Sequence, residues 1–184
     1  MPEITGEAKL NPAGTDATQP EKPIEMKDGK PVEPFSWHSF GAHFVEVEVD
    51  AELFTTRVKR VTTVMDVGRV ISPKTARSQI QGGIIWGVGM ALLERTIYDP
   101  RTGRIVTRNL ADYLVPTHAD APEIDVHFLD YQDLRLNVAG ARGMGEIGLV
   151  GMAAALANAI FNATGRRVRR LPITPDVLLE ATPV

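Results

Sequence analysis

Residues 140–148 have the types and the spacing best suited to chemistry in this 184-residue chain. The segment reads Gly-Ala-Arg-Gly-Met-Gly-Glu-Ile-Gly and opens an apolar, helix-like stretch. Glycines let a backbone approach a ligand and adopt positive φ, and a helix start offers free N–H groups to an anion. Glu146 falls at that start, where the helix dipole favours a carboxylate. The segment indicates either a ligand site with Glu146 as a partly buried general base or a stabilising first-turn glutamate.

Gly143, Gly145 and Gly148 also have the spacing of a dinucleotide-binding turn, Gly-x-Gly-x-x-Gly. That motif needs a preceding strand, a following helix and an acidic residue about 20 positions later. Residues 149–175 contain no Asp or Glu, although the arginine-rich segment 166–170 could bind a 2′-phosphate instead. Two prolines within 171–175 disfavour the next parallel strand, so a nucleotide-binding domain is the weaker alternative.

Other polar residues give less specific signals. The histidines show no metal-ligand spacing with neighbouring acids, so we predict no metal ligand among the side chains. Gln79 and Gln81 lie on a mostly apolar predicted helix, where a buried amide needs a partner such as a polar ligand. Trp86, among glycines and isoleucines, is expected in the core rather than as a stacking platform.

Composition excludes several classes of protein. The chain has no cysteine, which rules out disulfides, thiol catalysis, cysteine-ligated zinc and an iron–sulfur cluster held by this chain. Lys plus Arg number 20 and Asp plus Glu 23, a near balance that argues against a nucleic-acid binder. No continuous apolar run of about 18 residues predicts a membrane span, and the N-terminus lacks the pattern of a signal peptide.

The chain divides into an N-terminal segment and a domain. Residues 1–34 hold six of the 13 prolines and seven acidic residues, and are expected to be flexible or extended. Residues 35–184 form the predicted domain. In it, residues 44–50 alternate apolar and acidic side chains, and the short link to the β-rich run 56–64 predicts an antiparallel hairpin.

Further elements follow the same logic. Ser72 and Pro73 predict the start of a helix that continues to residue 95 and contains four glycines, which close packing or a ligand must offset. A second hairpin is predicted around residues 99–103, a strand at 124–129, and an edge strand at 134–138. A second long helix is predicted over 145–163 with Gly165 as its C′ residue. The sum is an α+β domain with mixed or antiparallel strands and two long Gly/Ala-rich helices.

An ordered set of short motifs resembles the C-terminal part of the molybdopterin-binding large subunit of the xanthine dehydrogenase/aldehyde oxidase family. The resemblance extends over residues 35–180 and is closest to bacterial aldehyde-oxidising members with separate subunits. One departure is Trp86, where many relatives carry glutamine. The matching stretches are 39–47 (Ser-Phe-Gly-Ala-His-Phe-Val-Glu-Val), 65–68 (Met-Asp-Val-Gly), 79–83 (Gln-Ile-Gln-Gly-Gly) with Gly87 and Gly89, 109–113 (Asn-Leu-Ala-Asp-Tyr), 143–146 (Gly-Met-Gly-Glu) and 171–175 (Leu-Pro-Ile-Thr-Pro).

The resemblance implies a molybdenum-dependent oxidoreductase that hydroxylates aldehydes or N-heterocycles with water as the oxygen source. It assigns Glu146 as the base that takes a proton in the reaction. Gln79 aligns with the glutamine that hydrogen-bonds the cofactor, and four residues of the glycine-rich segment would lie against the pterin. These four are Arg142, Gly143, Met144 and Gly145. The molybdenum is held by the pterin dithiolene rather than by protein ligands.

The resemblance also implies partners. The family's molybdenum subunit is far longer than 184 residues, so we expect a truncated product, a split gene product or a subunit that is inactive alone. The remainder of the molybdenum subunit would share the cofactor, and 2Fe-2S and FAD groups would lie on partner chains. A non-catalytic assembly or binding module of the same fold is the alternative. The expected location is the cytoplasm, or the periplasm if the complete enzyme is exported.

Overall fold

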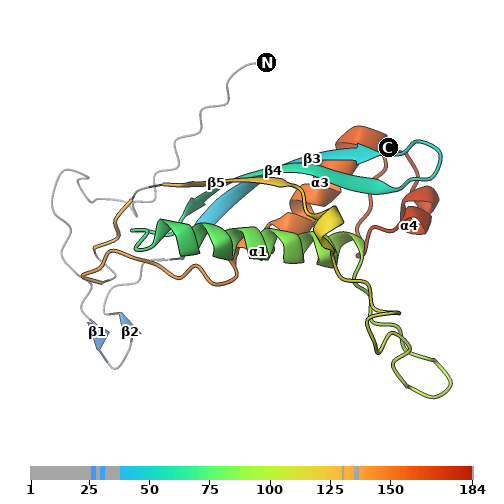
Figure 1. Ribbon diagram of the computed structural model, residues 1–184, viewed down its shortest axis with the longest axis horizontal. Coiled ribbons are helices and arrows are strands. Elements are labelled where there is room, and N and C mark those ends of the chain that lie inside the picture. Colours follow the sequence, from blue (N-terminus) through green and yellow to red (C-terminus); the bar gives the residue numbers. More distant parts are fainter. Residues whose placement is uncertain (1–25, 28–29, 32–37, 130, 135–136, 184) are drawn as a thin grey trace.

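The computed structural model describes residues 26–27, 30–31, 38–129, 131–134 and 137–183. It contains a three-stranded sheet with helices, which confirms the predicted α+β class (Figure 1). The expectation for residues 1–34 falls almost entirely outside the described residues. The elements are β1 (Met26–Lys27), β2 (Lys30–Pro31), β3 (Phe40–Val49), β4 (Thr56–Asp66), α1 (Pro73–Leu92), the 3-10 turn η1 (His118–Asp120), β5 (Glu123–Phe128), α2 (Ile147–Val150), α3 (Met152–Thr164) and α4 (Pro175–Glu180).

The predicted hairpin is present as β3 and β4, which pair antiparallel from Phe40 opposite Asp66 to Val49 opposite Thr56. A β-bulge interrupts the register after Glu46, and it lets Val58 and Val61 both face the core although three positions separate them. The predicted strand at 124–129 is β5, which pairs parallel to β4. The sheet order is therefore β3-β4-β5, with mixed strand directions.

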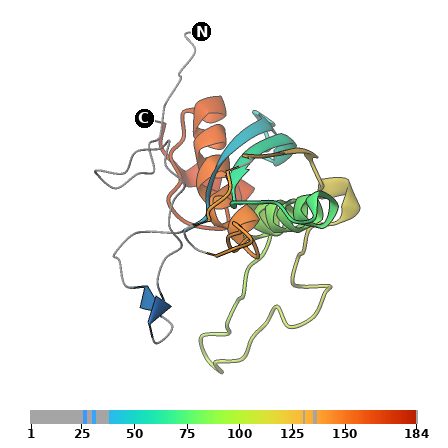
Figure 2. The same ribbon diagram turned by 90° about the vertical axis from the view of Figure 1, so that its left-hand side faces the viewer.

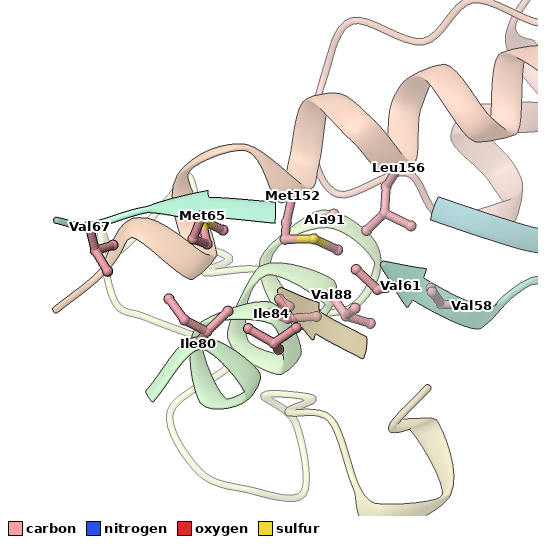
Figure 3. Close-up of a cluster of buried hydrophobic side chains, with 11 residues drawn as sticks. Val58, Val61, Met65, Val67, Ile80, Ile84, Val88, Ala91, Met152 and Leu156 are labelled. Carbon is pink, nitrogen blue, oxygen red and sulfur yellow. The ribbon is translucent and has the colours of Figure 1, made fainter. Parts of the chain in front are cut away.

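One face of the sheet carries the core. Alternate residues of β4, including Val61 and Met65, point toward α1 and α3 and are fully buried there (Figure 3). Ile80, Ile84 and Val88 fill this space from α1, at the spacing of one helix face. The opposite face of the hairpin carries charged and exposed side chains such as Glu46 and Glu48, as a sheet covered on one side requires.

The glycines of α1 allow it to lie directly against α2. A Cβ atom at Gly83 would come within 3.1 Å of Gly148, and one at Gly148 within 2.7 Å of the Ile80 carbonyl oxygen. One turn later, a Cβ at Gly87 would lie 2.4 Å from that of Met152. Backbone contact explains Gly83 and Gly148, and contact with the Met152 side chain of α3 explains Gly87, whereas a Cβ at Gly82 would meet nothing within 4 Å.

The predicted single helix over 145–163 is wrong in one respect, because the chain turns at Gly151 between α2 and α3. A Cβ at residue 151 would lie 2.5 Å from the His43 ring, so this contact leaves room only for glycine at the turn. Gly165 ends α3 with φ of 69°, as predicted. The stretch Ile147–Thr164 has the length and composition of a membrane-crossing helix, with a mean hydropathy of 1.5. One such stretch is weak support for a span, because it meets the criteria of length and composition only.

A long loop connects α1 and η1 and projects below the sheet in Figure 2. The predicted second hairpin is reduced to a single bridge between Tyr98 and Ile105, closed by the expected turn at Asp99. Leu134 and Val138, expected in an edge strand, lie in turns. Trp86 is 49% exposed rather than part of the core. The short helix α4 was not predicted.

Two glycines of α1 give a matched test of this packing. Gly82→Ala should raise the free energy of unfolding by about 0.5–1 kcal/mol, because the methyl group enters open space and alanine favours a helix. Gly87→Ala should lower it by about 1–3 kcal/mol, because the methyl group overlaps Met152. Urea unfolding of the two variants measures both values. Equal effects of the two substitutions would contradict the packing of α1 on α3.

Candidate functional site

A buried ion pair lies at the base of the glycine-rich segment. The Arg142 guanidinium donates through Nη2 to the Asp66 carboxylate at the end of β4. Only 5% of the Arg142 side chain and 3% of the Asp66 side chain are exposed. Arg142 Nη1 also donates to the His38 carbonyl oxygen at 3.2 Å, and Asp133 lies 3.8 Å from Nε. The guanidinium of Arg142 is thus engaged by protein groups.

Backbone pairing holds the same region together. Gly68 and Ala141 form an antiparallel bridge. In it, the Arg142 N–H donates to the Val67 carbonyl oxygen at 2.8 Å, and the Arg69 N–H donates to the Gly140 carbonyl oxygen at 2.7 Å. Gly68 has φ of 67°, and a Cβ there would lie 2.5 Å from the Gly140 carbonyl oxygen, so only glycine fits. The segment that follows β4 therefore aligns the start of the glycine-rich segment.

Residues 143–146, here called the site loop, are fixed through their carbonyl groups. The Ser39 hydroxyl donates to the Gly143 carbonyl oxygen at 2.5 Å, and the Gln79 amide donates to the Gly145 carbonyl oxygen at 2.5 Å. Within the described part of the chain, the N–H groups of the site loop have no hydrogen-bond acceptor. Cβ atoms at Gly143 and Gly145 would meet nothing within 4 Å. Among the described residues, the loop thus keeps unpaired N–H donors, and space is open beside its two glycines.

The site loop separates two surface hollows. The α1 hollow, of about 440 Å³, lies at the start of α1. Its lining includes Gln79, Ala141 and Arg142. The β3 hollow, of about 570 Å³, contains Glu146 and His43. Met144 and Gly145 line both hollows. The structure thus brings together all six residues that the sequence analysis assigns to a site. Arg142 and the site loop, which includes Glu146, are continuous in the chain, and Gln79 contacts the loop from α1.

Glu146 is exposed and stands immediately before α2. Its side chain forms no capping hydrogen bond, and its position at the N-cap of α2 is compatible with the predicted alternative of a carboxylate favoured by the helix dipole. The partial burial expected for a tuned base is also absent in this chain. Because α2 has only four residues, the donors near Glu146 come from the site loop rather than from a long helix.

The dinucleotide alternative finds no support in the fold. Gly148 packs against the backbone of α1 instead of facing a ligand. In the described residues immediately before Gly143, 131–134 and 137–142, the chain forms turns and a single bridge rather than the strand that the motif requires. Two neighbours of the site were missed by the sequence analysis. Ser39 and Asp66 lie in stretches 39–47 and 65–68 that carry the family resemblance, but no spacing or pattern in the sequence assigned them to the site.

His43 lies on the core-facing side of β3 and lines the β3 hollow with Glu146. Its Nδ1 atom is buried and has no hydrogen-bond partner within the described part of the chain. Burial lowers the pKa of His43 below its ordinary value of 6.5, and the Ile147 backbone opposes this change only in part. Burial therefore favours the neutral form of the ring in the folded chain.

Comparison with known proteins agrees with this geometry. Residues 4–122 match the molybdopterin cofactor-binding domain family. Over 145 residues the chain is 48% identical to the aldehyde oxidoreductase molybdenum-binding subunit PaoC of Escherichia coli, covering 79% of this chain and 20% of the relative. It is 35% identical over 142 residues to the putative xanthine dehydrogenase molybdenum-binding subunit XdhA of the same organism, covering 77% and 19%.

A solved structure supports the same fold. The aldehyde oxidoreductase from Desulfovibrio desulfuricans superposes with a TM-score of 0.73 and 30% identity, covering 88% of this chain and 17% of that one. The chain therefore spans about a fifth of the length of the curated relatives that it matches. The family match ends at residue 122, before the site loop, so it does not itself assign Glu146.

The burial of His43 predicts a pH dependence of stability. Between its lowered folded pKa and 6.5, the unfolded chain binds more protons than the folded chain, so stability falls as the pH drops through this window. The free energy of unfolding should be smaller at about pH 5.5 than at about pH 7.5. His43→Gln should reduce this difference, and His118→Gln, at an exposed position, should not. An unchanged pH dependence in His43→Gln would contradict the assignment.

Proposed function

The chain belongs to the molybdopterin cofactor-binding domain family, and from that premise we propose that it supplies the catalytic base and one wall of the cofactor site in a molybdenum hydroxylase. The observation that carries the proposal is the site loop, whose N–H groups have no acceptor among the described residues and which ends at Glu146. Its relatives are molybdenum-binding subunits, which supports a molybdopterin cofactor that carries molybdenum.

The residues around the α1 hollow fit a pterin cofactor. Pterin rings and their phosphate groups are rich in hydrogen-bond acceptors, and the site loop offers N–H donors that no described residue uses. Gly143 and Gly145 leave room for a ligand to lie against their backbone. We assign Gln79, Gly143, Met144 and Gly145 to this contact. Arg142 would contribute backbone atoms, because its side chain is buried.

Glu146 is the proposed general base. When bound, the cofactor supplies the two-electron oxidation, and water is the source of the oxygen that is added to the substrate. The role of Glu146 is to accept a proton at a carboxylate oxygen, which an exposed and uncapped side chain is free to do. The open β3 hollow would be covered by the rest of the subunit, which would exclude water and raise the basicity of the carboxylate.

The electrons must leave through other chains or domains. This chain has no cysteine to ligate an iron–sulfur cluster, so we propose that 2Fe-2S and FAD groups lie on partner subunits. Aldehydes or N-heterocycles are the proposed substrates, in a pocket shared with the remainder of the molybdenum subunit. We propose that the complete enzyme works in the cytoplasm, or in the periplasm if it is exported.

Substitution of the base tests the proposal directly. In the complete enzyme, Glu146→Gln should keep the molybdenum content and lower the rate of aldehyde oxidation by about 10²–10⁴-fold, because the amide cannot accept the proton. Glu52→Gln changes an exposed glutamate in the turn between β3 and β4, and should leave the rate unchanged. Normal activity of Glu146→Gln would contradict the assigned base and favour a non-catalytic module of the same fold.

Metal content of the isolated chain gives a second test. The 184-residue chain purified alone should contain no stoichiometric molybdenum and show no oxidation of aldehydes, because both hollows are open surfaces that cannot enclose a cofactor. Mixing it with the remainder of the subunit should restore activity. Metal analysis by mass spectrometry that finds one molybdenum per isolated chain would contradict this account of a shared site.

A further inference from the structure

We propose that Asp66 and Arg142 are positioning residues, which act as one buried pair to set the site loop and thereby Glu146. The inference rests on the proposed role of Glu146 but concerns two different residues. Neither carboxylate nor guanidinium is open to a ligand, because the exposed fractions of the two side chains are 3% and 5%. Their effect on the reaction would therefore be exerted through the loop.

The pair joins chain segments that are distant in sequence. Asp66 ends β4, and Arg142 immediately precedes the site loop, 76 positions later. Asp66 Oδ1 also accepts the Gly68 N–H at 3.2 Å, which shapes the turn that pairs with residue 141. Through the same carboxylate oxygen, the turn after β4 and the guanidinium are fixed relative to each other.

Arg142 extends this connection to three more groups. Its Nη1 donates to the His38 carbonyl oxygen, directly before Ser39, whose hydroxyl fixes Gly143. Its guanidinium lies 5.9 Å from the centre of the Phe40 ring and 3.8 Å, at Nε, from Asp133. The start of the loop is thus positioned from β3, from β4 and from residues 131–134 at once.

Charge makes the pair interdependent. A buried guanidinium without its carboxylate strongly destabilises the folded chain, and so does a buried carboxylate without its guanidinium. Asp133, which is partly buried, is too distant from Nε for a hydrogen bond, so it cannot replace Asp66 without movement. Loss of Asp66 should therefore displace Arg142 and, with it, the backbone that leads to Glu146.

The test uses the complete molybdenum subunit and four variants. Asp66→Asn removes one charge at constant shape, Arg142→Met removes the other, Arg142→Lys keeps a cation, and Asp66→Asn/Arg142→Met removes both. Glu123→Gln is the matched control, because it breaks the exposed pair between Arg60 and Glu123, 3.3 Å apart and away from the loop. Amide hydrogen exchange of the site loop and of α3 is measured in each, together with kcat, KM and molybdenum content.

We expect faster exchange in the site loop, by about tenfold or more, in Asp66→Asn and Arg142→Met, with α3 unchanged. The double variant should be no worse than either single variant, since the two residues act as one unit. Arg142→Lys should recover part of the protection. At normal molybdenum content, kcat should fall by about tenfold or more while KM stays constant, and Glu123→Gln should resemble the unsubstituted enzyme.

Three results would overturn the proposal. The first is normal exchange in the site loop of Asp66→Asn, and the second is additive losses in the double variant. The third is an equal loss of protection in α3 in every variant, Arg142→Lys included, which would assign the pair to general stability. Glu146→Gln, measured alongside, separates the proposed role of Glu146 from the proposed role of the pair. Full activity of Glu146→Gln would contradict its role as the base. The exchange data test the role of the pair without reference to activity.

Discussion

The buried ion pair between Asp66 and Arg142 is the constraint on which the site depends. A carboxylate at the end of β4 is almost completely removed from water, and such a charge is tolerated only beside an opposite charge. The chain can therefore complete the end of its sheet only if the glycine-rich segment lies alongside it. The bridge between Gly68 and Ala141, with positive φ at residues 68 and 140, is the backbone consequence of that approach.

A second constraint fixes the far end of the same segment. After Glu146 the chain enters α2, where Gly148 lies against the backbone of α1. Gly151, which follows α2, lies against His43. The site loop is thus fixed before and after by close contacts, and in the middle by hydrogen bonds to its carbonyl oxygens from Ser39 and Gln79. Within the described residues its N–H groups have no acceptor, because the hydrogen bonds that hold the loop are made to its carbonyl oxygens. A preorganised donor array of this kind suits an acceptor-rich ligand.

Local patterns in the sequence were sufficient for much of the fold. The alternation in β3, the Ser-Pro start of α1 and the glycine at 165 each depend on neighbours in the sequence, and each was predicted correctly. The turn at Gly151 was not predicted; the glycine there lies against His43, more than a hundred residues earlier, and local sequence does not show that contact. The exposure of Trp86 was also missed, since an apolar sequence context does not reveal which helix face meets the sheet.

The site shows the same division. Its glycines and Glu146 stand together in the sequence and were found there. Gln79 and Gln81 were both singled out as amides on an apolar helix, and the family resemblance selected Gln79. Asp66 and Ser39 act through long-range contacts that spacing cannot predict.

The most direct test of the account is a crystal structure of the complete enzyme with its cofactor. We predict that the cofactor contacts Gln79 and the site loop, with a Glu146 carboxylate oxygen within about 3.2 Å of the reacting group. A cofactor bound elsewhere, with Glu146 facing solvent, would contradict the account.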